Sequence, residues 1–111
     1  MEDTTPPADR LNVLLADRDE TLATAESLTG GLVGSRVTDV AGASAYFDRG
    51  FVTYTYDAKR ELLGVSRESL DAHGAVSEPV VREMAAGARD RAEADWAGAN
   101  TGSAGPAGGT D

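Results

Sequence analysis

Ala25-Glu26-Ser27-Leu28-Thr29-Gly30-Gly31 is the stretch that decides the fold. The residues before it, Thr21 to Ala25, are short, small and partly β-branched, as in a buried strand. After it, Leu32, Val33 and Val37 recur at helical spacing and make an apolar stripe. The chain is therefore predicted to turn sharply from strand into helix within this stretch.

The turn itself admits two interpretations. Gly30 and Gly31 let the backbone come close to a ligand. The N-terminus of the following helix would offer unpaired N–H groups and a positive dipole end, which suit an oxyanion or a phosphate. Alternatively, Ser27 and Thr29 simply cap that helix. The residue types alone leave both interpretations open.

Composition limits the classes of function. Ten basic and nineteen acidic residues give the 111-residue chain a net charge of −9, which argues against nucleic acid as a partner. The sequence has no cysteine, so disulfides and thiolate chemistry are excluded. No apolar run approaches the roughly 20 residues of a membrane span. The acidic start of the chain is unlike a signal peptide, and the cytoplasm is the expected location.

Helices and strands are predicted to alternate along the chain. Helices are expected at about 8–19, from Gly30 to about Val40, at 58–63 after a cap at Asp57, between Ser66 and Gly74, and from Ser77 onward. The last helix should bury a stripe of small and apolar residues, namely Val81, Met84, Ala85, Ala88 and Ala92. Strands are expected at 21–25, 45–55 and 95–101, with a loop at 41–44.

This alternation is typical of the α/β class. Three strands with helices between them predict a three-layer α/β/α sandwich around a small, incomplete sheet. In open α/β sheets, ligands bind beyond the carboxyl ends of the strands. Ser27, Thr29 and the glycine-rich stretch 102–109 are therefore expected at one rim.

Ser27 needs a base before it can attack an amide. Two candidates are present, His73 and Lys59. Lys59 is the only lysine and follows the aromatic strand closely; a lysine buried there would lose its proton more easily and serve as the base. His73 is more typical of a charge partner at a helix C-terminus. Glu26 could orient Lys59, hold a tyrosine or cap the helix.

Neither a metal nor a nucleoside triphosphate is indicated. No His/Cys/Asp cluster has metal-ligand spacing. Residues 102–109 lack the Gly-Lys-Ser/Thr ending of a P-loop.

Several blocks of sequence resemble a known family in order and spacing. The blocks are Thr24-Ala25-Glu26-Ser27-Leu28-Thr29-Gly30-Gly31, Gly50-Phe51-Val52-Thr53-Tyr54, Ala58-Lys59, Leu63-Gly64-Val65, His73-Gly74-Ala75-Val76-Ser77 and Thr101-Gly102-Ser103-Ala104-Gly105-Pro106-Ala107-Gly108-Gly109. Together they resemble the CinA C-terminal domain, a family that includes PncC-type nicotinamide-nucleotide amidohydrolases. The resemblance runs from about Leu11 to Gly109.

The resemblance implies hydrolysis of the carboxamide of nicotinamide mononucleotide to nicotinate mononucleotide and ammonia, without a metal or other cofactor. It implies Ser27 as nucleophile and Lys59 as its proton acceptor. The implied substrate-binding residues surround that pair: Glu26, Thr29, Gly30, Gly31, Tyr54, Thr101, Gly102 and Gly105. N–H groups near Thr29–Gly31 are expected to hold the oxyanion.

The chain departs from the family pattern at three places. Tyr56 stands where the family usually has Asn, and Ala107 where it has Asp. Family domains also continue with a further strand, a helix and an arginine that looks like a phosphate ligand. The expected organisation is a disordered tail over 1–8 and a domain over 9–111 that lacks the final strand and helix, with a glycine-rich end that is mobile from about Gly105.

This shortening leaves an alternative function open. The chain could be a catalytically inactive remnant that binds a nucleotide weakly or serves as an interaction module. A sheet without its last strand exposes an edge that invites pairing. We therefore expect a homo-oligomer, or a partner chain that completes the sheet.

Overall fold

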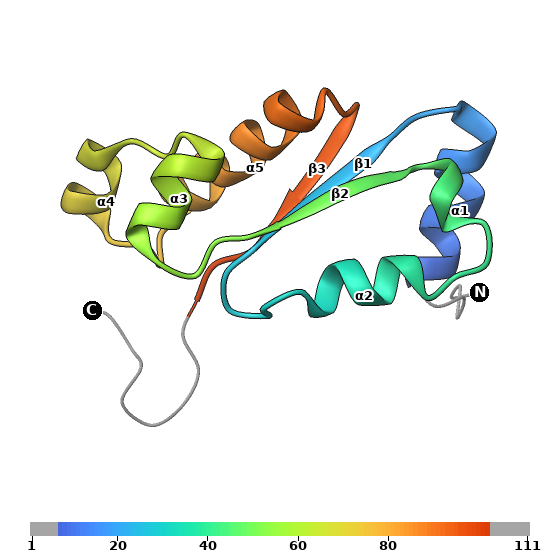
Figure 1. Cartoon of the computed structure of the whole chain (residues 1–111), viewed down its shortest axis with the longest axis horizontal. Coiled ribbons are helices and arrows are strands. Elements are labelled where there is room, and N and C mark those ends of the chain that lie inside the picture. The colour runs from blue at the N-terminus through green and yellow to red at the C-terminus, as the bar shows by residue number, and fades with distance from the viewer. Residues whose placement is uncertain (1–6, 103–111) are drawn as a thin grey trace, which may run out of the picture.

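A three-stranded parallel sheet lies at the centre of the computed structural model, which describes residues 7–102 (Figure 1). The strand order is β2-β1-β3. β1 (Leu22–Glu26) lies in the middle and pairs in parallel with both β2 (Phe47–Val52) and β3 (Trp96–Ala99). All five residues of β1 are buried, which explains its short, small side chains.

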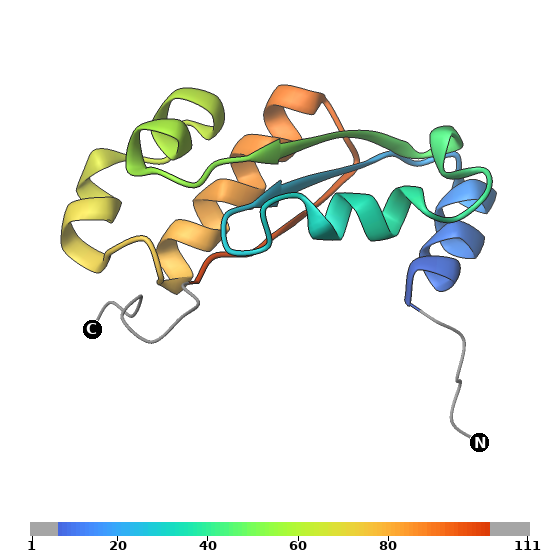
Figure 2. The same ribbon diagram turned by 60° about the horizontal axis from the view of Figure 1, so that its bottom comes forward.

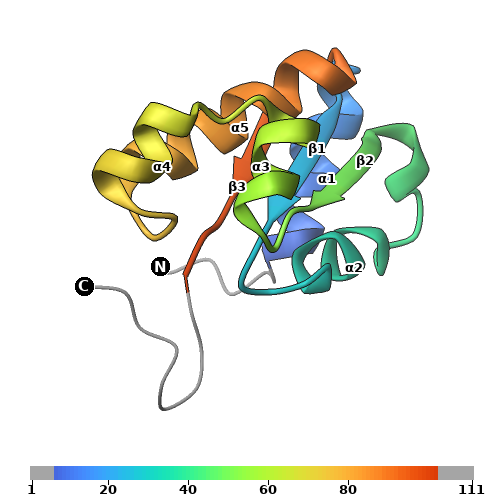
Figure 3. The same ribbon diagram turned by 60° about the vertical axis from the view of Figure 1, so that its left-hand side comes forward.

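Helices cover both faces of this sheet (Figures 2 and 3). One face carries α1 (Pro7–Arg18) and α2 (Leu32–Thr38), and a short 3₁₀ turn, η1 (Ala43–Ala45), precedes β2. The other face carries α3 (Tyr56–Leu63), α4 (Arg67–His73) and α5 (Glu78–Ala92). The predicted three-layer α/β/α arrangement is confirmed.

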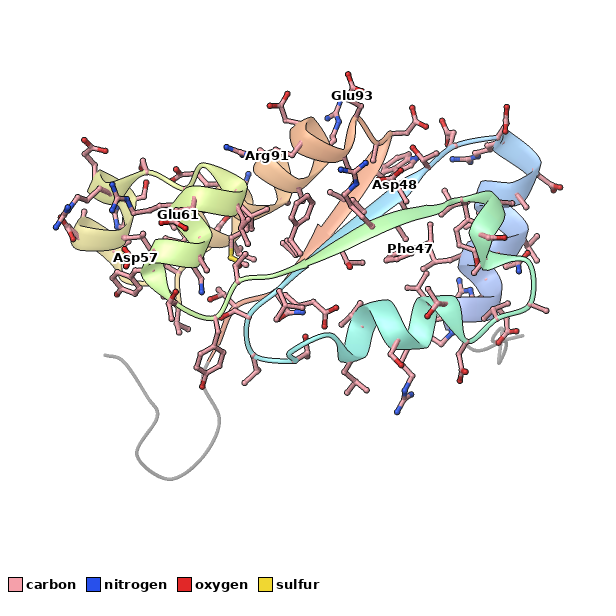
Figure 4. The ribbon with its side chains drawn as sticks, viewed as in Figure 1. Phe47, Asp48, Asp57, Glu61, Arg91 and Glu93 are labelled. Carbon is pink, nitrogen blue, oxygen red and sulfur yellow. The ribbon has the colours of Figure 1, made fainter. Side chains whose placement is uncertain are left out.

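Each face has its own apolar core. The core under α5 consists mainly of aliphatic side chains, namely Ala23, Ala25, Leu63, Val65, Leu70, Val80, Met84, Ala88, Ala92 and Ala94. The core under α1 and α2 is smaller and consists of Leu15, Leu22, Val37, Ala43 and Tyr46. Phe47 joins it by pointing from β2 toward α2 (Figure 4).

Two helix starts match the sequence prediction and one does not. Ser66 and Ser77 each cap a helix, accepting hydrogen bonds from the backbone amides of Ser69 and Val80. The cap of α3 is Thr55 and not Asp57, because the Thr55 hydroxyl accepts the amide of Ala58.

The helix stripes are also shifted in two places. In α5 the buried valine is Val80, and Val81 is only half-buried. In α2 only Val37 is buried, while Leu32 and Val33 are exposed. Periodicity locates a helix, but two adjacent valines leave its rotation undecided.

Element boundaries differ modestly from the prediction. The third strand is shorter than 95–101, and the expected loop at 41–44 contains the start of η1. Pro7 and Ala8 belong to α1 and not to a tail. Residues 1–6 and 103–111 lie outside the described residues, and so does the predicted mobility from Gly105.

An apolar groove of about 380 Å³ runs between α1, α2 and β3. Its lining consists of Leu11, Leu14, Leu15, Arg18, Leu22, Thr24, Val33, Val37, Trp96, Ala97 and Gly98. Trp96 is 50% exposed, and within residues 7–102 β3 is an edge strand. No helix among these residues is long and apolar enough to cross a bilayer.

Candidate active site

The carboxyl ends of the three strands meet at one rim of the sheet (Figure 1). Ser27 directly follows β1, Thr53 directly follows β2, and Asn100 directly follows β3. The amide of Thr53 donates to the carbonyl of Glu26 at 2.8 Å, and the amide of Asn100 donates to the carbonyl of Ala25 at 3.0 Å. These bonds extend the parallel pairing past the strands, so the three residues are held side by side.

Ser27 and Lys59 form a hydrogen-bonded pair at this rim. The Nζ atom of Lys59 lies 2.9 Å from the Oγ atom of Ser27. Lys59 belongs to the first turns of α3, and helical side chains lean toward the helix N-terminus. That lean brings Nζ back to the end of β2, beside β1. The predicted contact between the two side chains is confirmed.

The surroundings of Lys59 lower the pKa of its amine. Its side chain is 0% exposed, and burial lowers its pKa from the usual 10.5. Besides Ser27, Nζ contacts only carbonyl oxygens, those of Thr53 at 2.7 Å and Tyr54 at 3.3 Å. No carboxylate within residues 7–102 forms an ion pair with it. Its positive charge is therefore poorly compensated.

Glu26 caps α2 from inside the protein. Its carboxylate is 2% exposed and accepts the amides of Val33 at 2.8 Å and Gly34 at 2.9 Å. The amide of Gly31 and the hydroxyl of Thr29 also donate to it. Burial acts to raise the pKa of Glu26, but these four hydrogen bonds outweigh it and the net pKa is lowered.

The cap corrects one part of the sequence prediction. One of the two interpretations left open by the sequence had the N-terminus of α2 offering unpaired N–H groups to a ligand, but the amides of Gly31, Val33 and Gly34 already bind Glu26. Of the three roles considered for Glu26, the structure shows the helix cap. An anion at this helix end would have to displace a buried carboxylate.

A different set of amides remains open at the turn. Gly30 has a φ of +59° and Gly31 a φ of +111°, so the chain reverses here in conformations that suit glycine. Within residues 7–102, no hydrogen-bond acceptor is found for the amides of Leu28, Thr29 and Gly30. These three amides belong to the residues that directly follow Ser27 in the chain, so they are the candidate donors for a developing negative charge.

The other predicted site residues divide between the rim and elsewhere. Tyr54 contributes its carbonyl to Lys59, while its side chain is 76% exposed. Gly102 lies against the side chain of Leu28. The hydroxyl of Thr101 donates to the carbonyl of Ala75 at 2.6 Å, and no hydrogen bond joins it to Ser27 or Lys59 within residues 7–102.

The remaining two positions do not contribute to the described site. Gly105 lies outside the described residues. His73 is exposed in the last turn of α4. Lys59, and not His73, is thus the base candidate that reaches Ser27.

Asn100 is the rim residue that sequence reasoning missed. Its side-chain oxygen accepts the amide of Ser27 at 3.3 Å, and its side-chain nitrogen donates to the hydroxyl of Thr29 at 3.0 Å. Its position directly after a strand was the available signal. Among residues 7–102, no group of three His, Asp or Glu residues is arranged to hold a metal ion.

Fold and site together define a three-layer α/β protein with a buried serine–lysine pair at the carboxyl ends of its parallel strands. The profile of the CinA C-terminal domain matches residues 4–111. The chain therefore belongs to the CinA C-terminal domain family.

Relatives and solved structures agree with this membership. Nicotinamide-nucleotide amidohydrolase PncC of Escherichia coli K12 is 52% identical over 104 residues, covering 94% of this chain and 63% of PncC. A CinA-like protein of Mycolicibacterium gilvum is 59% identical over 102 residues, or 92% of this chain and 24% of that protein. The crystal structure of the competence/damage inducible protein CihA from Agrobacterium tumefaciens superposes with a TM-score of 0.90 at 50% identity, covering 93% of this chain and 62% of CihA. The chain thus spans less than two thirds of these relatives.

Proposed function

We propose that this protein is a serine–lysine amidohydrolase that releases ammonia from the carboxamide of nicotinamide mononucleotide. The observation that carries the proposal is the 2.9 Å contact between Lys59 Nζ and Ser27 Oγ, made by a fully buried lysine. The substrate follows from the name of the PncC relative, nicotinamide-nucleotide amidohydrolase.

The hydrogen bonds around Lys59 suit a general base. A neutral amine has two N–H donors and one lone pair. The carbonyls of Thr53 and Tyr54 can only accept, so they take the two N–H groups. The lone pair is then left for the hydroxyl proton of Ser27, which is the direction that nucleophile activation requires.

The reaction proceeds in two proton-balanced halves. Ser27 Oγ forms a bond to the amide carbon while its proton passes to Lys59 Nζ. The resulting ammonium returns that proton to the amide nitrogen, the C–N bond breaks, and ammonia leaves behind an ester on Ser27. Water then attacks the ester, giving one proton to Lys59, which passes it to Ser27 Oγ as the C–O bond breaks; the carboxylic acid that leaves then loses its remaining proton to solvent and becomes nicotinate.

Two further features support this chemistry and substrate. The amides of Leu28, Thr29 and Gly30, which have no acceptor within residues 7–102, lie in the turn that follows Ser27 and would stabilise the oxyanion of each tetrahedral intermediate. The ring of Tyr54, whose backbone carbonyl contacts Lys59, is exposed and offers a face on which a pyridine ring could stack. The scheme uses no metal and no other cofactor, and its substrate would place the protein in cytoplasmic pyridine nucleotide salvage.

Ammonia release from nicotinamide mononucleotide is the direct test. Ser27→Ala should abolish release, whereas Ser35→Ala, which trims an exposed serine of α2, should leave it unchanged. Lys59→Met should also abolish it, because no other base contacts Ser27 within residues 7–102. Wild-type turnover by Ser27→Ala would refute the nucleophile assignment.

The same experiment distinguishes the amidohydrolase from the alternative, an inactive nucleotide-binding module. Equilibrium binding of nicotinamide mononucleotide without any ammonia release would identify a binding module. If the protein neither binds nicotinamide mononucleotide nor releases ammonia from it, the proposed substrate is refuted.

A further inference from the structure

Asn100 ties the end of β3 to the turn that carries Ser27. Its backbone amide continues the β1–β3 pairing, and its half-buried side chain reaches across to the turn. There it contacts two residues, the amide of Ser27 at 3.3 Å and the hydroxyl of Thr29 at 3.0 Å. Ser27 is thus contacted by Lys59 from α3 and by Asn100 from the end of β3.

The orientation of the Asn100 amide follows from its neighbours. The hydroxyl proton of Thr29 is donated to the carboxylate of Glu26, so the Thr29 oxygen is left to accept. The Thr29 oxygen accepts a hydrogen bond from the Nδ2 group of Asn100. The Oδ1 atom then faces the N–H of Ser27, and lies 3.4 Å from the Thr29 hydroxyl. Only a side chain with both a donor and an acceptor completes this arrangement.

We propose that Asn100 is a positioning residue for the nucleophile, an inference that rests on the proposed amidohydrolase function. By holding the turn through Ser27 and Thr29, it fixes the Ser27 hydroxyl against Lys59. By accepting the N–H of Ser27, it also removes that amide from the oxyanion site. The oxyanion is then stabilised by the amides of residues 28–30, and not by the amide of the nucleophile itself.

The kinetic test compares Asn100→Asp and Asn100→Ala with Asn12→Asp. Asn12 is a matched control, since its side chain bonds the carbonyl of Ala41 far from the rim. Asn100→Asp has nearly the same shape but no donor, and we expect kcat to fall by about 10- to 100-fold because the reacting groups are displaced. KM should change much less, by under about threefold.

The pH profile distinguishes positioning from a general loss of structure. The carboxylate of Asn100→Asp adds a negative charge near Lys59, which favours the protonated amine, so the acid limb of kcat against pH should move to higher pH. Asn100→Ala should lower kcat without moving that limb. Asn12→Asp should leave both unchanged. Unaltered kcat in both Asn100 variants would overturn the proposal.

Hydrogen exchange tests the proposal without relying on activity. In Asn100→Ala, the amide of Ser27 should exchange at least about tenfold faster than in wild type, while amides in the middle of α5 keep their rates. Asn12→Ala should change neither. An unchanged Ser27 rate would overturn the positioning role even in an active enzyme. Accelerated exchange in a protein that releases no ammonia would uphold the contact and refute the proposed function.

Discussion

Lys59 is a basic residue that lowers the stability of the fold whenever it is charged. Its folded-state pKa lies below the unfolded value of 10.5. Between these two pKa values the unfolded chain binds more protons, so the free energy of unfolding rises with pH across that interval. Below the folded-state pKa the cost is fully present, and above 10.5 it is gone.

Replacing Lys59 should remove this pH dependence. Urea unfolding of wild type between about pH 7 and pH 10 should show stability rising by at most about 1.4 kcal/mol per pH unit from this group. Lys59→Met should reduce the slope, whereas Arg36→Met, which removes an exposed cation of α2, should retain it. Equal slopes in Lys59→Met and wild type would contradict the assignment.

Glu26 is the acidic counterpart, a buried charge that stabilises the fold. Its pKa is lowered by four donors, so its contribution is present above pH 4.5 and is lost as pH falls through the lowered pKa. Glu26→Gln should cost about 1–3 kcal/mol at neutral pH, because one backbone N–H would then face an amide group without an acceptor.

A surface carboxylate provides the control for Glu26. Glu61 is exposed on α3 (Figure 4), so Glu61→Gln should leave the free energy of unfolding within about 0.5 kcal/mol. The difference between the two variants should shrink as unfolding is measured at progressively lower pH. A constant difference would mean that the charge of Glu26 is not what the α2 amides bind.

At the scale of elements, α3 and α5 approach each other closely at a glycine. A Cβ atom on Gly87 would lie 1.9 Å from the carbonyl oxygen of Leu63. Helix propensity predicts that Gly87→Ala stabilises α5 by about 1 kcal/mol. The contact predicts the opposite sign, a loss of roughly 1–3 kcal/mol or more, because the two helices must separate.

Thermal unfolding decides between these two effects. Gly98→Ala is the control, since a Cβ there meets nothing within 4 Å. We expect a lower Tm for Gly87→Ala and little change for Gly98→Ala. A raised Tm for Gly87→Ala would show that α5 can shift away from α3 at small cost.

The sequence predicted those elements whose ends are determined locally. Ser66 and Ser77 were recognised as caps because a cap bonds an amide three residues along the same chain. The strand–turn–helix at Ser27 was predicted because apolar periodicity changes there. The pairing of Ser27 with Lys59 was predicted because both follow parallel strands, and neighbouring parallel strands end at one rim.

Asn100 was not predicted, and the cap of α2 by Glu26 was only one of three roles considered for that residue, because the partners of these side chains are distant in the sequence or compete with one another. Asn100 acts on residues more than 70 positions away, and no local pattern marks such a contact. Glu26 takes the amides that were expected to await a ligand, at five to eight positions along the chain. The sequence shows that a carboxylate precedes a helix N-terminus, but it does not show whether that carboxylate accepts the helix amides or leaves them open.

At the scale of the whole molecule, the groove between α1, α2 and β3 is an exposed surface with a mostly apolar lining. The homo-oligomer expected from the sequence would bury this groove together with the edge of β3, which is unpaired within residues 7–102. Sedimentation of the purified protein should then show concentration-dependent association.

Two neighbouring residues of α1 provide the matched test. Leu14 lines the groove, whereas Val13 is exposed and does not. Leu14→Asp should weaken association and Val13→Asp should not. Association that is unchanged in Leu14→Asp would place the interface elsewhere.

Because Lys59 is buried, its rate of chemical modification can report on opening of the site. Because the sequence has a single lysine and its side chain is 0% exposed, an amine-acylating reagent meets only the amino terminus while the site stays closed. The rate of acylation at Lys59 would then depend on how often the rim opens, since we expect the reagent to reach Nζ only when α3 moves away from the strand ends. A nucleotide bound over Ser27 should slow acylation of Lys59 and leave acylation of the amino terminus unchanged. Mass spectrometry of the labelled protein would then measure how often the site opens during turnover.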